Sequence, residues 1–168
     1  MPPPKTETLD WLRLIRSQNV GPITFYKLLE RFGTARAALD ALPEMAKRGG
    51  AKTFKAHPKA EAERELEELE KIDGKIVLRS DADFPPLLSQ VEDAPPLLSV
   101  LGHSHLLKKR TVAIVGARNA SLNGKNFARQ IAADLGAAGL LIASGMARGL
   151  DAAAHQGAMN SGTVAVLG

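Results

Sequence analysis

The first third of the chain carries apolar side chains at the spacing of amphipathic helices. They recur over residues 9–15 and again over residues 25–32, with the segment Val20-Gly21-Pro22 between them. Pro22 suits the first turn of a helix, where its missing N–H is not needed as a donor. The pattern therefore predicts a small bundle of α-helices over residues 7–48.

The second of these helices has a clear end, and the third has a clear beginning. Gly33 can end the second helix, and Thr34 can cap a third helix that extends to Leu42. The Val20-Gly21-Pro22 turn looks like a helix-hairpin-helix element, whose N–H groups can contact a DNA phosphate. The second glycine of such hairpins is absent, because Ile23 stands there. A bundle that only packs or docks a partner is the alternative.

The middle of the chain predicts one helix followed by two short strands. A glutamate-rich helix with a thin apolar stripe covers residues 58–73, and apolar runs predict strands at residues 75–78 and 97–101. Prolines within residues 83–86 and 94–96 hold the connecting chain extended. We expect three parts: a helical domain over residues 1–50, a connecting helix within residues 51–74 and an α/β domain over residues 75–168.

From residue 111 onward, β-branched runs alternate with alanine-rich helical segments. The order is strand, helix, strand, helix, strand, with the helices at about residues 122–138 and 149–160. Short turns between them require parallel strands joined by right-handed crossovers. This βαβαβ pattern is half of a Rossmann-like doubly wound sheet, and Gly168 comes directly after a strand. We therefore expect an α/β fold whose second domain is incomplete at its C-terminus.

Composition is that of a soluble globular protein, with 45% apolar and 24% charged residues among 168. No apolar run approaches the ~18 residues that span a bilayer, and the N-terminus lacks the apolar stretch of a secretory signal. We expect a cytoplasmic protein without membrane insertion. Zero cysteines exclude disulfides, and the four scattered histidines predict no metal site.

Positive charge is concentrated in the last part of the chain. The net charge is only +4, but residues 94–168 hold seven basic and two acidic side chains. No carboxylate occurs from Ala94 to Ala133. This one-signed segment favours a polyanionic partner, because lysine and arginine neutralise phosphates. An ordinary solvated basic surface is the alternative.

Two glycine-containing turns carry the candidate chemistry. Each follows an apolar strand and leads into a helix, one within residues 111–121 and the other within residues 143–151. Backbone N–H groups and helix N-termini brought together in this way bind phosphate. A dinucleotide site is disfavoured, because Arg118 replaces the second glycine of G-x-G-x-x-G and no acid follows the second strand. A guanidinium suits an exposed phosphodiester instead.

Several polar residues near these turns have supporting roles or two interpretations. Ser121 can cap the helix that follows it or bind a phosphate oxygen. Asn119 and Lys125 lie beside the first turn and are expected to support it. Asp151 and His155 are four residues apart on one helix face, so we expect a hydrogen bond between them that orients the second turn.

These segments resemble the DprA (Smf) family of DNA-processing proteins. The N-terminal helices are similar to that family's sterile-alpha-motif-like or helix-hairpin-helix domain. The resemblance covers residues 7–168, and the two glycine turns in tandem are its most specific part. It is carried by residues 83–88 (DFPPLL), 93–102 (DAPPLLSVLG), 112–121 (VAIVGARNAS), 143–155 (ASGMARGLDAAAH) and 162–168 (GTVAVLG).

The resemblance implies a DNA-binding protein that is not an enzyme and has no cofactor. Members of this family bind single-stranded DNA during natural transformation and deliver it to the RecA recombinase. In this chain the phosphate contacts would fall on Gly116, Ala117, Arg118, Ser121, Ser144, Gly145, Arg148 and Gly149. Ala117 stands where the family has a small polar residue, so only its N–H could serve. The family's Rossmann-like domain runs beyond Gly168, and a homodimer through that later part is expected.

A nucleotide-processing enzyme is the alternative function. A phosphoribohydrolase acting on a nucleoside monophosphate would need an acid near the sugar, and Asp151 is the only acid near the crevice. A scaffold whose turns hold an adventitious anion is a third interpretation. Phe127 is the one aromatic residue after position 93, so recognition of a strand would rest on its phosphates. This predicts weak sequence preference and strong salt dependence.

Overall fold

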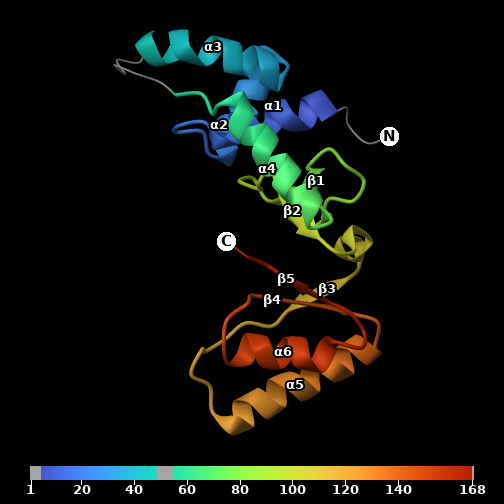
Figure 1. Ribbon diagram of the computed structural model, residues 1–168. Coiled ribbons are helices and arrows are strands. Elements are labelled where there is room, and N and C mark those ends of the chain that lie inside the picture. The colour runs from blue at the N-terminus through green and yellow to red at the C-terminus, as the bar shows by residue number, and fades with distance from the viewer. Residues whose placement is uncertain (1–4, 49–54, 168) are drawn as a thin grey trace. The chain divides into compact units, whose positions relative to one another are not determined.

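The computed structural model describes residues 5–48 and 55–167, and the chain divides into two compact units, Met1–Ser104 and His105–Gly168. The helices of the described part are α1 (Lys5–Arg16), α2 (Pro22–Phe32), α3 (Ala35–Arg48), α4 (Lys59–Lys71), α5 (Leu122–Ala137) and α6 (Leu150–Ala158) (Figure 1). Its strands are β1 (Gly74–Leu78), β2 (Leu97–Leu101), β3 (Thr111–Ala113), β4 (Leu141–Ser144) and β5 (Thr163–Ala165). The predicted fold class is confirmed: a helical part precedes an α/β part with a parallel sheet. The expected domain boundary at residue 50 lies outside the described residues.

The predicted helical bundle forms where local signals begin and end each helix. α2 begins at Pro22, and Gly33, with φ +79°, ends it by donating its N–H to the carbonyl of Leu29. Thr34 caps α3 by accepting a hydrogen bond from the N–H of Ala37 at 3.2 Å. The apolar faces of the helices meet around a fully buried phenylalanine of α2, Phe25.

α4 belongs to the core of the first unit and connects its helices to a small sheet. β1 pairs antiparallel with β2 along its whole length. Ala62 of α4 is fully buried in a cluster with Leu12 of α1, Leu78 of β1 and Leu97 of β2. One face of the glutamate-rich helix therefore packs against α1 and the small sheet, although Ile72 at its C-terminal end is exposed.

The second unit contains the predicted βαβαβ arrangement. β3, β4 and β5 form a parallel sheet in that order, and α5 and α6 lie on the same face of it (Figure 1). Gly157 of α6 lies so close to α5 that a Cβ atom would overlap the carbonyl oxygen of Arg129. Small side chains allow this approach, and the core between the helices and the sheet consists of Ala132, Ile142, Ala154 and Ala158.

Candidate functional site

The two predicted glycine turns follow β3 and β4 and lie at the same edge of the sheet, because these strands are parallel. Their backbones are in contact. Gly149 has φ +92°, and a Cβ atom there would overlap the carbonyl oxygen of Ala117 and lie 2.6 Å from that of Arg118. The N–H of Leu150 also donates to the Ala117 carbonyl, at 3.3 Å. Position 149 therefore requires glycine, and the two turns form one assembly.

Asp151 links the two turns from the interior. Its Oδ1 accepts a hydrogen bond from the N–H of Gly116 at 3.3 Å, and the residue is only 6% exposed. Its Oδ2 would lie 2.7 Å from a Cβ atom at position 145, which is glycine in this chain. The dipole of α6 stabilises a carboxylate in its first turn. Asp151 thus serves as an internal acceptor that connects the first turn to α6.

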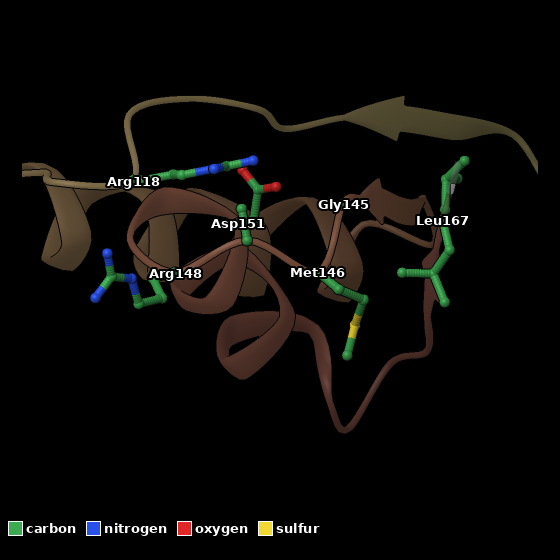
Figure 2. Close-up of a pocket in the computed structure, with 8 residues that line it drawn as sticks. Arg118, Gly145, Met146, Arg148, Asp151 and Leu167 are labelled. Atoms are coloured by element: carbon green, nitrogen blue, oxygen red, sulfur yellow. The ribbon is translucent and has the colours of Figure 1, made fainter.

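A hollow of about 490 Å³ opens beside this assembly. Arg118 of the first turn and Arg148 of the second border it, and both residues are exposed. Figure 2 shows Arg118 extending toward Asp151, whereas Arg148 projects away from that carboxylate. Within residues 5–48 and 55–167, neither guanidinium forms a hydrogen bond or an ion pair. Both cations are therefore available to a ligand.

The helices that follow the two turns begin differently. Ser121 caps α5, because its Oγ accepts a hydrogen bond from the N–H of Gly124 at 3.1 Å. α6 begins after Gly149 without a side-chain cap. In the part of the chain that the structure describes, the N–H groups of residues 146–148 donate to no other group. Residues 146–148 line the hollow, so these donors can serve an anion there.

His155 has other partners than the one expected from its spacing. Its Nδ1 lies 2.8 Å from the hydroxyl oxygen of Thr163, and its Nε2 lies 2.7 Å from the carbonyl oxygen of Gly145. The expected hydrogen bond between Asp151 and His155 is therefore wrong. The physical reason is that α6 packs on the sheet, so the ring meets β5 and the end of β4 before it can meet a side chain of its own helix.

The predicted site residues fall into three groups. Four of them line the hollow: Arg118, Gly145, Arg148 and Asp151. Three form the contact between the turns: Gly116, Ala117 and Gly149. The other five neither line the hollow nor form that contact: Asn119, Ser121, Lys125, Ser144 and His155. Among these, Ser144 is buried and donates its hydroxyl to the carbonyl of Ile114 at 2.5 Å, so its side chain is used inside the fold.

Four residues that line the hollow were missed by the sequence reasoning: Met146, Ala147, Val166 and Leu167. The sequence did contain a signal for Val166 and Leu167. A third parallel strand must also end at the edge where the two turns lie, and the residues that follow β5 then face the same hollow. These additions make one wall of the hollow apolar.

The hollow can bind an anion of low charge. Two unpaired guanidinium groups and a run of free N–H donors attract negative charge, and the buried carboxylate of Asp151 offsets part of that attraction. Among the described residues, no three side chains of metal-binding type gather into a site. No described helix is long and apolar enough to cross a membrane.

Comparison with known protein families tests the resemblance directly. A family model described as DNA recombination-mediator protein A matches residues 75–168. The chain belongs to this family. A second model, described as the DprA-like N-terminal HHH domain, matches residues 5–67. The resemblance to the DprA (Smf) family is thereby confirmed.

Curated relatives in this recombination-mediator family come from several bacteria. The chain is 30% identical to protein Smf of Synechocystis sp. over 97% of its own length and 44% of that protein. It is 34% identical to protein Smf of Escherichia coli over 70% of its length and 32% of that protein. It is 41% identical to DNA processing protein DprA of Streptococcus pneumoniae over 52% of its length and 32% of that protein. The chain thus spans less than half the length of these relatives.

A solved structure of the family has the same fold. The X-ray structure of DNA processing protein A from Streptococcus pneumoniae matches 88% of this chain and 57% of its own, with a TM-score of 0.50 and 27% sequence identity. The match extends over most of the helical part and the α/β part described above. It supports the order of a helical part followed by a parallel α/β part.

Proposed function

We propose that this chain binds single-stranded DNA through its backbone phosphates and, in natural transformation, passes the strand to a RecA recombinase. The observation that carries the proposal is the contact between the two turns at Gly149 and Ala117, which brings two exposed guanidinium groups to one hollow. Neither guanidinium has a partner within the described residues. The family's description as a DNA recombination mediator supports DNA as the ligand.

A phosphodiester strand suits the hollow better than a free nucleotide does. The planar guanidinium fork matches the oxygens of a phosphate, and the N–H groups of residues 146–148 can bind further oxygens. The buried Asp151 carboxylate repels a doubly charged terminal phosphate more strongly than a singly charged diester. Contacts to phosphates without contacts to base edges give weak sequence preference and strong dependence on salt.

Arg118→Ala tests this proposal. Titration of a fluorescent oligo-dT across a salt series should show binding weakened by about 1–3 kcal/mol, the range for losing a hydrogen bond to a charged group. The dependence of log affinity on log salt should fall by about one unit. The matched control is Arg110→Ala, which removes an exposed arginine at the opposite end of β3 and should have a much smaller effect.

Two results would contradict the role of Arg118. One is unchanged affinity and salt slope in a folded Arg118→Ala protein. The other is an equal loss in Arg118→Ala and Arg110→Ala, which would indicate diffuse attraction by a basic surface rather than a bound strand. Circular dichroism of both variants establishes that they are folded.

The enzyme alternative is tested beside the titration by a hydrolysis assay on nucleoside monophosphates. We expect no turnover, because Asp151 is buried and already accepts the N–H of Gly116. Turnover that disappears in Asp151→Asn would establish the enzyme and overturn the binding proposal. Neither the hollow nor the family match favours that alternative.

Delivery to RecA and assembly as a homodimer are proposals that follow from the family resemblance. We expect RecA to assemble faster on oligo-dT that already carries the bound protein than on oligo-dT without it. The DNA-dependent ATPase activity of RecA measures this assembly. Sedimentation velocity shows whether the protein is a monomer or a dimer in solution. An unchanged RecA rate with saturating bound protein would remove the delivery step while leaving strand binding intact.

A further inference from the structure

His155 lies on α6 in direct contact with the second turn but does not line the hollow. Its ring is held at both nitrogens: Nε2 is 2.7 Å from the carbonyl oxygen of Gly145, and Nδ1 is 2.8 Å from the hydroxyl oxygen of Thr163. Thr163 in turn donates its hydroxyl to the carbonyl of Ile142 on β4, at 2.8 Å. A chain of hydrogen bonds therefore runs from the sheet through His155 to the turn.

The contact with Gly145 fixes where the ring carries a proton. A carbonyl oxygen can only accept, so Nε2 must be the donor. A hydroxyl can accept from a protonated Nδ1 or turn and donate to a bare Nδ1. Thr163 has one hydroxyl hydrogen, so it either donates it to the Ile142 carbonyl and accepts from a protonated Nδ1, or turns it from Ile142 to a bare Nδ1. In both cases the hydroxyl holds the ring, and the Nε2–H remains directed at Gly145.

The carbonyl of Gly145 determines the direction of the next N–H. A trans peptide is planar, and its carbonyl and N–H point in opposite directions. Because the Gly145 carbonyl faces the His155 ring, the N–H of Met146 faces away from that ring. Met146 lines the hollow, and its N–H donates to no group within the described residues.

We propose that His155 is a positioning residue of the hollow: its Nε2–H holds the Gly145 carbonyl and thereby directs the Met146 N–H toward a bound anion, while Thr163 fixes the ring. Only the identity of that anion as a DNA phosphate rests on the proposed function. The role differs from packing, because it depends on a hydrogen-bond donor and not on the volume of the ring.

Two substitutions at position 155 separate positioning from packing. His155→Phe keeps an aromatic ring without a donor, and His155→Gln keeps an N–H donor without the ring. Positioning predicts that His155→Phe weakens oligo-dT binding about fivefold, the effect of one lost hydrogen bond, and that His155→Gln stays within about twofold of the wild type. Both variants should keep the wild-type salt slope, because no charged group that contacts phosphate is removed.

Two substitutions at position 163 test the hydrogen bond between Thr163 and the His155 ring, which lies further from the hollow than the bond to Gly145. Thr163→Val keeps the β-branched shape and removes the hydroxyl, and Thr163→Ser keeps the hydroxyl. We expect Thr163→Val to weaken binding about threefold and Thr163→Ser to bind like the wild type, because only the hydroxyl holds Nδ1. Thermal unfolding of all four variants identifies any loss that comes from partial unfolding.

The amide signal of Met146 in a two-dimensional ¹⁵N NMR spectrum tests the inference without any DNA. It should shift in His155→Phe and in Thr163→Val and stay near its wild-type position in His155→Gln and Thr163→Ser. An unmoved Met146 signal in His155→Phe, or wild-type affinity in that variant, overturns the proposal. If the wild type does not bind oligo-dT at all, the proposed function fails, and the Met146 signals still decide whether His155 positions the turn.

Discussion

The two glycine turns both lead from a strand into a helix, but the helix after the first turn has a side-chain cap and the helix after the second has none. After the first turn, Ser121 satisfies the N-terminus of α5 with its own side chain. After the second turn, α6 has no side-chain cap, and the N–H groups of residues 146–148 have no partner within the described chain. The first turn thus contributes mainly a guanidinium, and the second contributes a guanidinium together with free backbone donors. A side-chain cap at a helix N-terminus serves the fold, whereas the free N–H groups that precede α6 can serve a ligand.

The contact between the two turns at Gly149 is the point at which a substitution should have the largest effect. In Gly149→Ala, the new Cβ would collide with the backbone of the first turn at Ala117 and Arg118. The positive φ adds strain of about 1–3 kcal/mol, and the collision adds about 1–3 kcal/mol more. We expect a large loss in the free energy of unfolding and no measurable oligo-dT binding. Urea unfolding followed by circular dichroism is the measurement, because the single tryptophan, Trp11, belongs to the other compact unit.

Gly139→Ala is the control for Gly149→Ala. Gly139 also has positive φ, +86°, but a Cβ atom there would meet nothing within 4 Å. It should therefore show only the strain, and oligo-dT binding should persist. Equal destabilisation by the two substitutions would mean that the close approach of the turns contributes nothing.

Arg148→Ala tests the guanidinium that the second turn contributes. Arg148 acts beside the free N–H groups, so we expect a loss of about 1–3 kcal/mol in oligo-dT affinity and a salt slope reduced by about one unit. If both turns hold one strand, the double variant Arg118→Ala/Arg148→Ala should lose about two units of slope. A double variant no weaker than Arg118→Ala alone would show that the second guanidinium does not reach the strand.

Ser121→Ala should have the smallest effect, and on stability rather than on binding. Loss of an N-cap serine costs about 1 kcal/mol, and thermal unfolding measures it. Ser121→Asp keeps a capping oxygen and should recover most of that stability. Oligo-dT affinity should stay unchanged in Ser121→Ala, because Ser121 does not line the hollow. A selective loss of affinity would instead assign Ser121 to the bound phosphate.

Features that depend on neighbouring residues could be predicted from the sequence. Pro22 begins α2, Gly33 ends it, Thr34 caps α3 and Ser121 caps α5, because each signal acts within one turn of its own helix. The parallel order of β3, β4 and β5 also followed from the alternation of strands and helices. The location of the two arginines at one hollow is a consequence of that order.

Contacts between distant residues could not be predicted in the same way. Asp151 bonds to Gly116, 35 positions away, and no local pattern favours that partner over His155. The i, i+4 spacing allows two side chains to meet, but the packing of α6 on the sheet decides which group each one actually meets. The role of His155 depends on the partners Thr163 and Gly145, and those become visible only when the sheet is assembled.

The close approach of α6 to α5 at Gly157 has a consequence for ligand selection. Methyl groups and bare backbone fill this contact, and they have no rotamers with which to adjust. Each helix begins at one of the two turns, so the separation of the turns could change only if a whole helix moved. That separation is a fixed dimension of the fold, so any adjustment to the spacing of charges on a ligand must come from the exposed side chains of Arg118 and Arg148.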